Sequence, residues 1–126
     1  MYTIAIRTRP NGKISDQVFA EFSVSTMNAL WEELGLDEQR VSEWRKTIES
    51  TQPEAPVFPE YPAISRLDYI VEGVVHFDPK QLHDDCTRVL PVAKSDATRQ
   101  LLGDLLGAAL LALGQENAEV IVHPFG

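Results

Sequence analysis

The sequence predicts an α+β fold in which a small, mostly antiparallel four-stranded sheet is covered by about four helices, in the order ββααβααβ. Four segments alternate apolar and polar residues with the period of two that is typical of strands, and four others repeat apolar residues at helical spacing. The chain has 126 residues, a length that suits one hydrophobic core. We therefore expect a single domain over residues 1–126.

The N-terminal segment predicts a β-hairpin over residues 2–24. Apolar and polar side chains alternate in Tyr2–Arg7 and again in Gln17–Val24, and Pro10-Asn11-Gly12 between them supplies turn residues. Phe19 interrupts the polar side of the second strand. Its position predicts either a partly covered face or an exposed aromatic side chain.

Two helices are predicted within residues 26–50. The first begins at a cap of Ser25 or Thr26 and ends at Gly35, and the second begins at a cap of Asp37. In both helices apolar residues recur at helical spacing, and each stripe includes a tryptophan. We expect both helices to pack on the core.

A proline-rich segment follows at residues 51–63. Its prolines recur at every third position, a period that matches polyproline II and excludes an α-helix: Pro53, Pro56, Pro59 and Pro62. Such a segment can be an exposed ligand for an aromatic groove or a strap against its own domain. The apolar Phe58 and Tyr61 and the neighbouring acids Glu54 and Glu60 favour the strap.

The second half of the chain predicts a strand over residues 66–77, two helices within residues 79–113 and a terminal strand over residues 118–123. Asp78 is expected to cap the first of these helices. Ser95 or Asp96 is expected to cap the second, and Gly114 to end it. Leucine and alanine cover about half of the circumference of this last helix, so we expect it to be the most buried one.

Catalytic residue types gather only between His76 and Cys86. His76 and His83 lack a metal-binding spacing such as HExxH, and the chain has no phosphate-binding glycine loop or hydrolase elbow. Asp84 is expected to pair with Arg88 across one helical turn, and Cys86 to be an inert thiol in the buried stripe. The sequence thus predicts no catalytic residue, metal ligand or cofactor.

Composition excludes several classes of protein. A net charge of −8 argues against nucleic acid, which is bound by clustered lysine and arginine. Cys86 is the only cysteine, which excludes an intramolecular disulfide and favours a reducing, cytoplasmic location. The N-terminus lacks a secretory signal, and the longest apolar stretch, residues 101–113, is too short to span a bilayer, so we expect no membrane association.

The uneven distribution of charge predicts a basic protein partner. Most acids fall within residues 16–72, where bases are few. The expected partner-binding residues lie on the first two helices and on the strap: Glu32, Glu33, Asp37, Glu38, Glu43 and Tyr61. The leading hypothesis is therefore a small acidic binding module, an inhibitor of a basic target that resembles immunity and antitoxin proteins in function only.

Two alternatives stay open. One is an enzyme or metal-binding protein of unrecognised type that uses His76 and His83. The other is a structural subunit of a homo-oligomer, because Gly103 and Gly107 have the spacing that lets two helices approach closely. The leucines around these glycines favour packing of the last helix on its own sheet, and we expect a monomer or a homodimer.

Overall fold

The computed structural model describes residues 1–34, 61–64, 66–67 and 73–124. The described residues form four strands and three α-helices, in this order: β1 (Tyr2–Thr8), β2 (Ser15–Phe22), α1 (Val24–Glu33), β3 (Val75–Phe77), α3 (Pro79–Val89), α4 (Asp96–Leu113) and β4 (Glu119–His123). The strands form one antiparallel sheet in the order β2-β1-β4-β3. The predicted α+β class and antiparallel four-stranded sheet are confirmed. The expected helix that begins at Asp37 lies outside the described residues.

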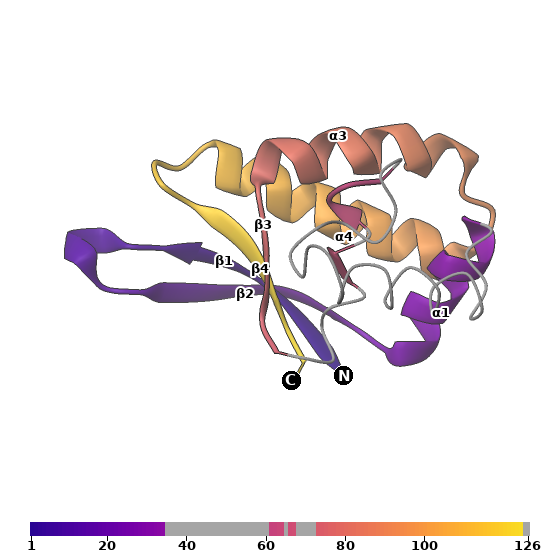
Figure 1. The fold of residues 1–126 in the computed structure, drawn as a ribbon, viewed down its shortest axis with the longest axis horizontal. Coiled ribbons are helices and arrows are strands. Elements are labelled where there is room, and N and C mark those ends of the chain that lie inside the picture. The colour runs from indigo at the N-terminus through magenta and orange to yellow at the C-terminus, as the bar shows by residue number, and fades with distance from the viewer. Residues whose placement is uncertain (35–60, 65, 68–72, 125–126) are drawn as a thin grey trace, which may run out of the picture.

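All three helices lie on one face of the sheet. Figure 1 shows α3 and α4 side by side over the sheet, with α1 at one end and the β1–β2 hairpin projecting at the other. Because side chains alternate along a strand, Ile4 and Ile6 of β1 face the helices together with Val120 and Val122 of β4. These side chains and the inward side chains of the helices form one core.

Side-chain caps fix where the helices begin. Asp78 accepts a hydrogen bond from the backbone N–H of Gln81 at 3.0 Å, and Ser95 accepts one from Thr98 at 3.4 Å, so both predicted caps are confirmed. The expected cap of α1 at Ser25 or Thr26 is wrong. Ser23 is the cap, because its extended backbone lets its hydroxyl accept from the N–H of Thr26.

The strand expected over residues 66–77 is shorter than predicted. Of its described residues, Val75–Phe77 pair in the sheet, while Ile64, Arg66 and Leu67 lie in a 3₁₀ turn. Side chains three residues apart eclipse one another in such a turn, so Ile64 and Leu67 both reach the core, where both are fully buried. Residues 68–72 of the expected strand lie outside the described part of the chain.

The C-terminal end of the expected strap lies against α3. Oδ2 of the buried Asp85 accepts hydrogen bonds from the backbone N–H groups of Ala63 at 2.7 Å and Ile64 at 3.1 Å. Arg88 donates to the other oxygen of Asp85 at 2.6 Å, so the expected pair of Arg88 with Asp84 is wrong. Residues 51–60 of the strap lie outside the described part of the chain.

Candidate functional site

Of the six predicted partner-binding residues, the structure describes three. Glu32 is exposed on the last turn of α1, free to meet a partner. Tyr61 is half-buried against the core, and the Arg88 guanidinium lies 5.8 Å from the centre of its ring. The other expected residues are outside the described residues: Asp37, Glu38 and Glu43.

Glu33 is exposed and also makes hydrogen bonds that stabilise the fold. Its carboxylate accepts hydrogen bonds from the backbone N–H groups of Lys94, at 3.0 Å, and Ser95. These amides stand at the N-terminal end of α4, where a negative charge also interacts favourably with the helix dipole. Glu33 therefore joins α1 to the start of α4.

The β2 strand is one edge of the sheet formed by the described strands. It is the outermost strand on its side, and no described strand pairs with its outer backbone. Val18 is 65% exposed and Phe19 is 37% exposed. Apolar side chains on an open edge strand are unusual, because such an edge invites pairing with another chain.

A β-bulge at Phe19 joins this edge to α4. The β1–β2 register shifts between Ile4 and Ala5, so Phe19 is the extra residue, and its ring reaches Gly107. A Cβ at Gly107 would lie 2.8 Å from Cζ of Phe19, so the helix accepts this ring only because residue 107 is glycine. The position of Gly107 confirms that it packs on its own sheet, whereas Gly103 has no neighbour within 4 Å of where its Cβ would be.

Exposed leucines continue the apolar surface along α4. Leu110 and Leu111 follow Gly107 by three and four residues, so they share its side of the helix, and about half of each side chain is exposed. We call the edge of β2 at Phe19, together with Leu110 and Leu111, the β2–α4 surface. Val18 pairs with Ala5, so its side chain lies on the other face of the same edge strand.

The face of the sheet that points away from the helices carries charged side chains. Arg7 makes two hydrogen bonds to Asp16, at 2.8 and 2.9 Å, and Nε2 of His123 lies 3.6 Å from Oδ2 of Asp16. The hydrogen bond from Arg7 is the main reason that the pKa of Asp16 is lowered, and the same bond raises the pKa of Arg7. This cluster is held together by its own charges.

A histidine–glutamate pair lies on the same face, beside β3. Oε1 of Glu119 is 3.0 Å from Nδ1 of His76 and 3.3 Å from Nη2 of Arg9. In this pair a carboxylate orients an imidazole, as in many general bases. The nearby Arg66 donates from Nε to the backbone oxygen of His76 at 3.0 Å.

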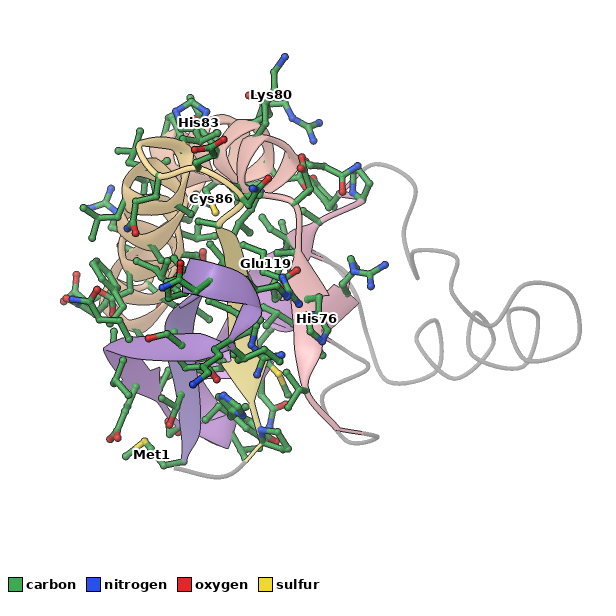
Figure 2. The ribbon with its side chains drawn as sticks, turned by 90° about the vertical axis from the view of Figure 1, so that its left-hand side faces the viewer. Met1, His76, Lys80, His83, Cys86 and Glu119 are labelled. Atoms are coloured by element: carbon green, nitrogen blue, oxygen red, sulfur yellow. The ribbon has the colours of Figure 1, made fainter. Side chains whose placement is uncertain are left out.

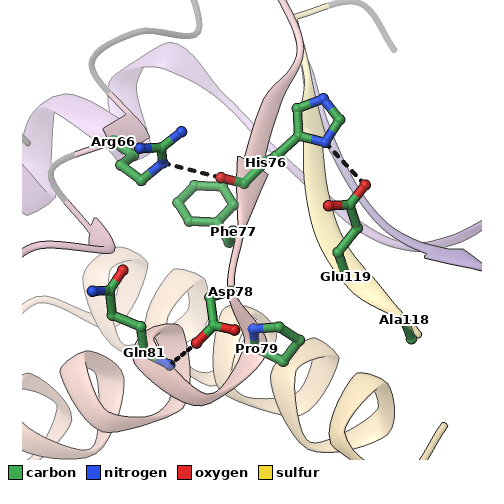
Figure 3. A pocket seen from close by; sticks show the side chains of 8 residues that line it. All are labelled: Arg66, His76, Phe77, Asp78, Pro79, Gln81, Ala118 and Glu119. Carbon is green, nitrogen blue, oxygen red and sulfur yellow. Dashed lines mark hydrogen bonds and ion pairs between the residues drawn. The ribbon is translucent and has the colours of Figure 1, made fainter. Parts of the chain in front are cut away.

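A hollow of about 410 Å³ opens next to this pair (Figure 3). Its walls come from the turn at residues 66–67, from β3 and the start of α3, and from the residues at the start of β4: Arg66, His76, Phe77, Asp78, Pro79, Gln81, Ala118 and Glu119. Asp78 already caps α3, and the described lining residues include the polar side chains of Arg66, His76, Gln81 and Glu119. These side chains can hydrogen-bond a small polar molecule.

The two histidines of the enzyme hypothesis are not brought together. Figure 2 shows His76 on β3 well apart from His83 on α3, where Nδ1 of His83 lies 3.3 Å from Oδ1 of Asp84. Within the described ranges no group of three histidine, cysteine or acidic side chains could hold a metal ion. Cys86 is buried as predicted, and its burial, reinforced by the neighbouring Asp85, raises the pKa of its thiol to about 12.

Comparison with protein-family models, with curated proteins and with solved structures found no match. Among the described residues, no helix is both long and apolar enough to cross a membrane. The candidate sites therefore rest on geometry alone.

Two of these features, the His76–Glu119 pair and the edge position of β2, were not predicted from the sequence. Glu119 and His76 are 43 residues apart along the chain, so their pairing depends on the adjacency of β3 and β4, which no local pattern indicates. The edge position of β2 also follows from strand order. The one local signal was Phe19, whose break in the alternating pattern marked the bulge.

Proposed function

We propose that this protein is a binding module for a basic protein partner. The β2–α4 surface carries this proposal, since it places apolar side chains beside an open sheet edge in a chain with a net charge of −8. Contiguous apolar surface bordered by polar residues is typical of protein-binding sites. Inhibition of a basic target, as by immunity and antitoxin proteins, is the specific form that we favour.

Acidic residues border the apolar surface. Glu21 is exposed on the same edge strand, on the face of the sheet away from the helices, and Asp104 precedes Gly107 by three residues on α4. Charges at the border of an interface accelerate association and set its dependence on salt, while the apolar centre supplies most of the affinity. A partner with lysine and arginine around an apolar patch fits this arrangement.

An affinity pull-down from lysate of the source cells, at low and then moderate salt, tests the proposal. We expect one basic protein to be retained and its retention to fall as salt rises. Leu110→Asp with Leu111→Asp should abolish retention even though it adds negative charge, because it removes apolar contact. Val92→Asp is the matched control, since Val92 is 70% exposed on the turn η3 (Leu90–Val92) at the far end of α3. Equal retention by both variants would contradict the proposed surface.

A second candidate function is binding of a small polar molecule at the hollow, with His76 as proton acceptor. The His76–Glu119 pair favours it, because Glu119 holds the imidazole by Nδ1 at the rim of the hollow. A thermal-shift screen with small anions and metal ions should find a ligand whose effect is lost in His76→Gln and kept in His83→Gln. A screen without hits, or equal shifts in both variants, would argue against this function.

A further inference from the structure

The two edges of the sheet differ in how they are covered. At β3 the edge strand has three residues, and Arg66 occupies the backbone oxygen of His76. At β2 the edge strand has eight residues, and no described residue bonds to its outer backbone. Natural proteins shorten or cover edges that must not pair with other chains, so β2 stands out as the edge left available.

The residues of β2 lack two of the usual protections of an edge strand, although the bulge at Phe19 is itself one of them. Lysine and proline commonly prevent an edge strand from pairing with other chains, and Ser15–Phe22 contains neither residue type. The bulge at Phe19 turns the aromatic ring onto Gly107 and leaves Ser15–Val18 as regular strand with exposed side chains. An incoming strand would find outer backbone groups along this stretch to which no described residue is bonded.

The charged side chains around the β2 edge indicate which kind of chain can pair with it. Glu21 and Asp104 border the edge, whereas Asp16 is already paired with Arg7. A second copy of the chain carries the same net charge of −8, so two copies repel each other overall, while a basic segment would be attracted. The occupant favoured by charge complementarity is therefore a different, basic chain.

We infer that β2 binds an extended basic segment of the partner by strand addition, so that the segment becomes a fifth strand of the sheet. Backbone hydrogen bonds to β2 would supply the pairing. Apolar side chains of the segment would contact Phe19 and Leu111, and its lysine or arginine side chains would approach Glu21 and Asp104. This inference rests on the proposed function and names the mode by which the partner binds.

Three short synthetic peptides probe this mode with the full-length protein. The first alternates lysine and valine, the second alternates glutamate and valine, and the third repeats the first with N-methylated valines. N-methylation removes backbone donors without changing charge or side chains, so it isolates strand pairing. We expect the first peptide to bind at least about tenfold more tightly than either of the others. Hydrogen exchange should slow at the amides of Ser15–Val18 when it binds.

A matched pair of variants locates the site. Val18→Lys places on β2 a positive charge that disfavours strand pairing, and Val92→Lys adds the same charge at a similarly exposed valine far from β2. We expect Val18→Lys to weaken binding of the lysine–valine peptide at least about tenfold and Val92→Lys to change it little. Equal binding by both variants would overturn the inference.

The outcomes also separate this mode from the proposed function. If the N-methylated peptide binds as well as the first, or if a basic protein is retained from lysate equally by wild type and Val18→Lys, strand addition is refuted while the binding function stands. If light scattering shows a dimer whose β2 amides are already protected, a second copy occupies the edge and the inference is wrong. If neither peptide nor lysate protein binds, both proposals fail.

Discussion

Removal of the Asp85 carboxylate should strongly destabilise the fold. Its Oδ2 accepts two backbone hydrogen bonds, from Ala63 and Ile64, and its side chain is only 2% exposed. A hydrogen bond to a charged group contributes about 1.5–3 kcal/mol, so Asp85→Ala should lower the free energy of unfolding by about 3–5 kcal/mol. A domain of this size has about 5–15 kcal/mol in total. Asp85→Asn keeps one acceptor oxygen and should lose about half as much.

Urea unfolding followed by tryptophan fluorescence measures this loss, because Trp31 is buried in the core. Asp84→Ala is the control, since the Asp84 side chain is 60% exposed and pairs, among the described residues, with the neighbouring His83. This variant should change stability by at most about 0.5 kcal/mol. In Asp85→Asn the amides of Ala63 and Ile64 should also exchange faster. A loss of less than about 1 kcal/mol in the free energy of unfolding of Asp85→Ala would refute the reasoning, because leaving two buried N–H groups without an acceptor should destabilise the fold by more than this.

Three further predictions follow from single contacts. Gly103→Ala should stabilise α4 by about 1 kcal/mol, because no described atom lies within 4 Å of the new Cβ. Gly107→Ala should stabilise the protein less, or destabilise it, because its Cβ meets the Phe19 ring. Urea unfolding compares the two variants. The pKa of Asp16 is lowered from 3.8, so the stability from its pair with Arg7 is present above that pH and is lost as the pH falls below it. Asp16→Asn should therefore flatten the acid limb of a pH–stability profile, and an unchanged limb would contradict the pairing. The raised pKa of Cys86 predicts a native thiol that iodoacetamide modifies at neutral pH only after unfolding, as mass spectrometry would show.

Local patterns predicted the local structure well. The hairpin, the caps at Asp78 and Ser95 and the burial of Cys86 all follow from neighbouring residues in the sequence. The error at the start of α1 was also local: Ser23, Ser25 and Thr26 can each cap a helix, and sequence alone does not give the backbone angles that select one.

Long-range contacts account for the errors that matter most to function. The sequence made no prediction for Asp85, yet its carboxylate binds the backbone of the turn after the proline-rich segment, 21 and 22 residues earlier in the chain. Arg88 pairs with it for the same reason, because the buried carboxylate offers the stronger site. No periodicity within α3 could reveal which of the two aspartates faces another segment.

The edge position of β2 can nevertheless be argued from the sequence once burial on both faces is considered. In β4 the apolar residues Val120–Val122 are consecutive, and in β1 so are Ile4–Ile6, and all six are buried. Consecutive apolar residues mark a strand covered on both faces, which belongs in the middle of a sheet. The second strand of the hairpin has polar residues on one side, so with β1 and β4 adjacent at the centre, β2 is left outside.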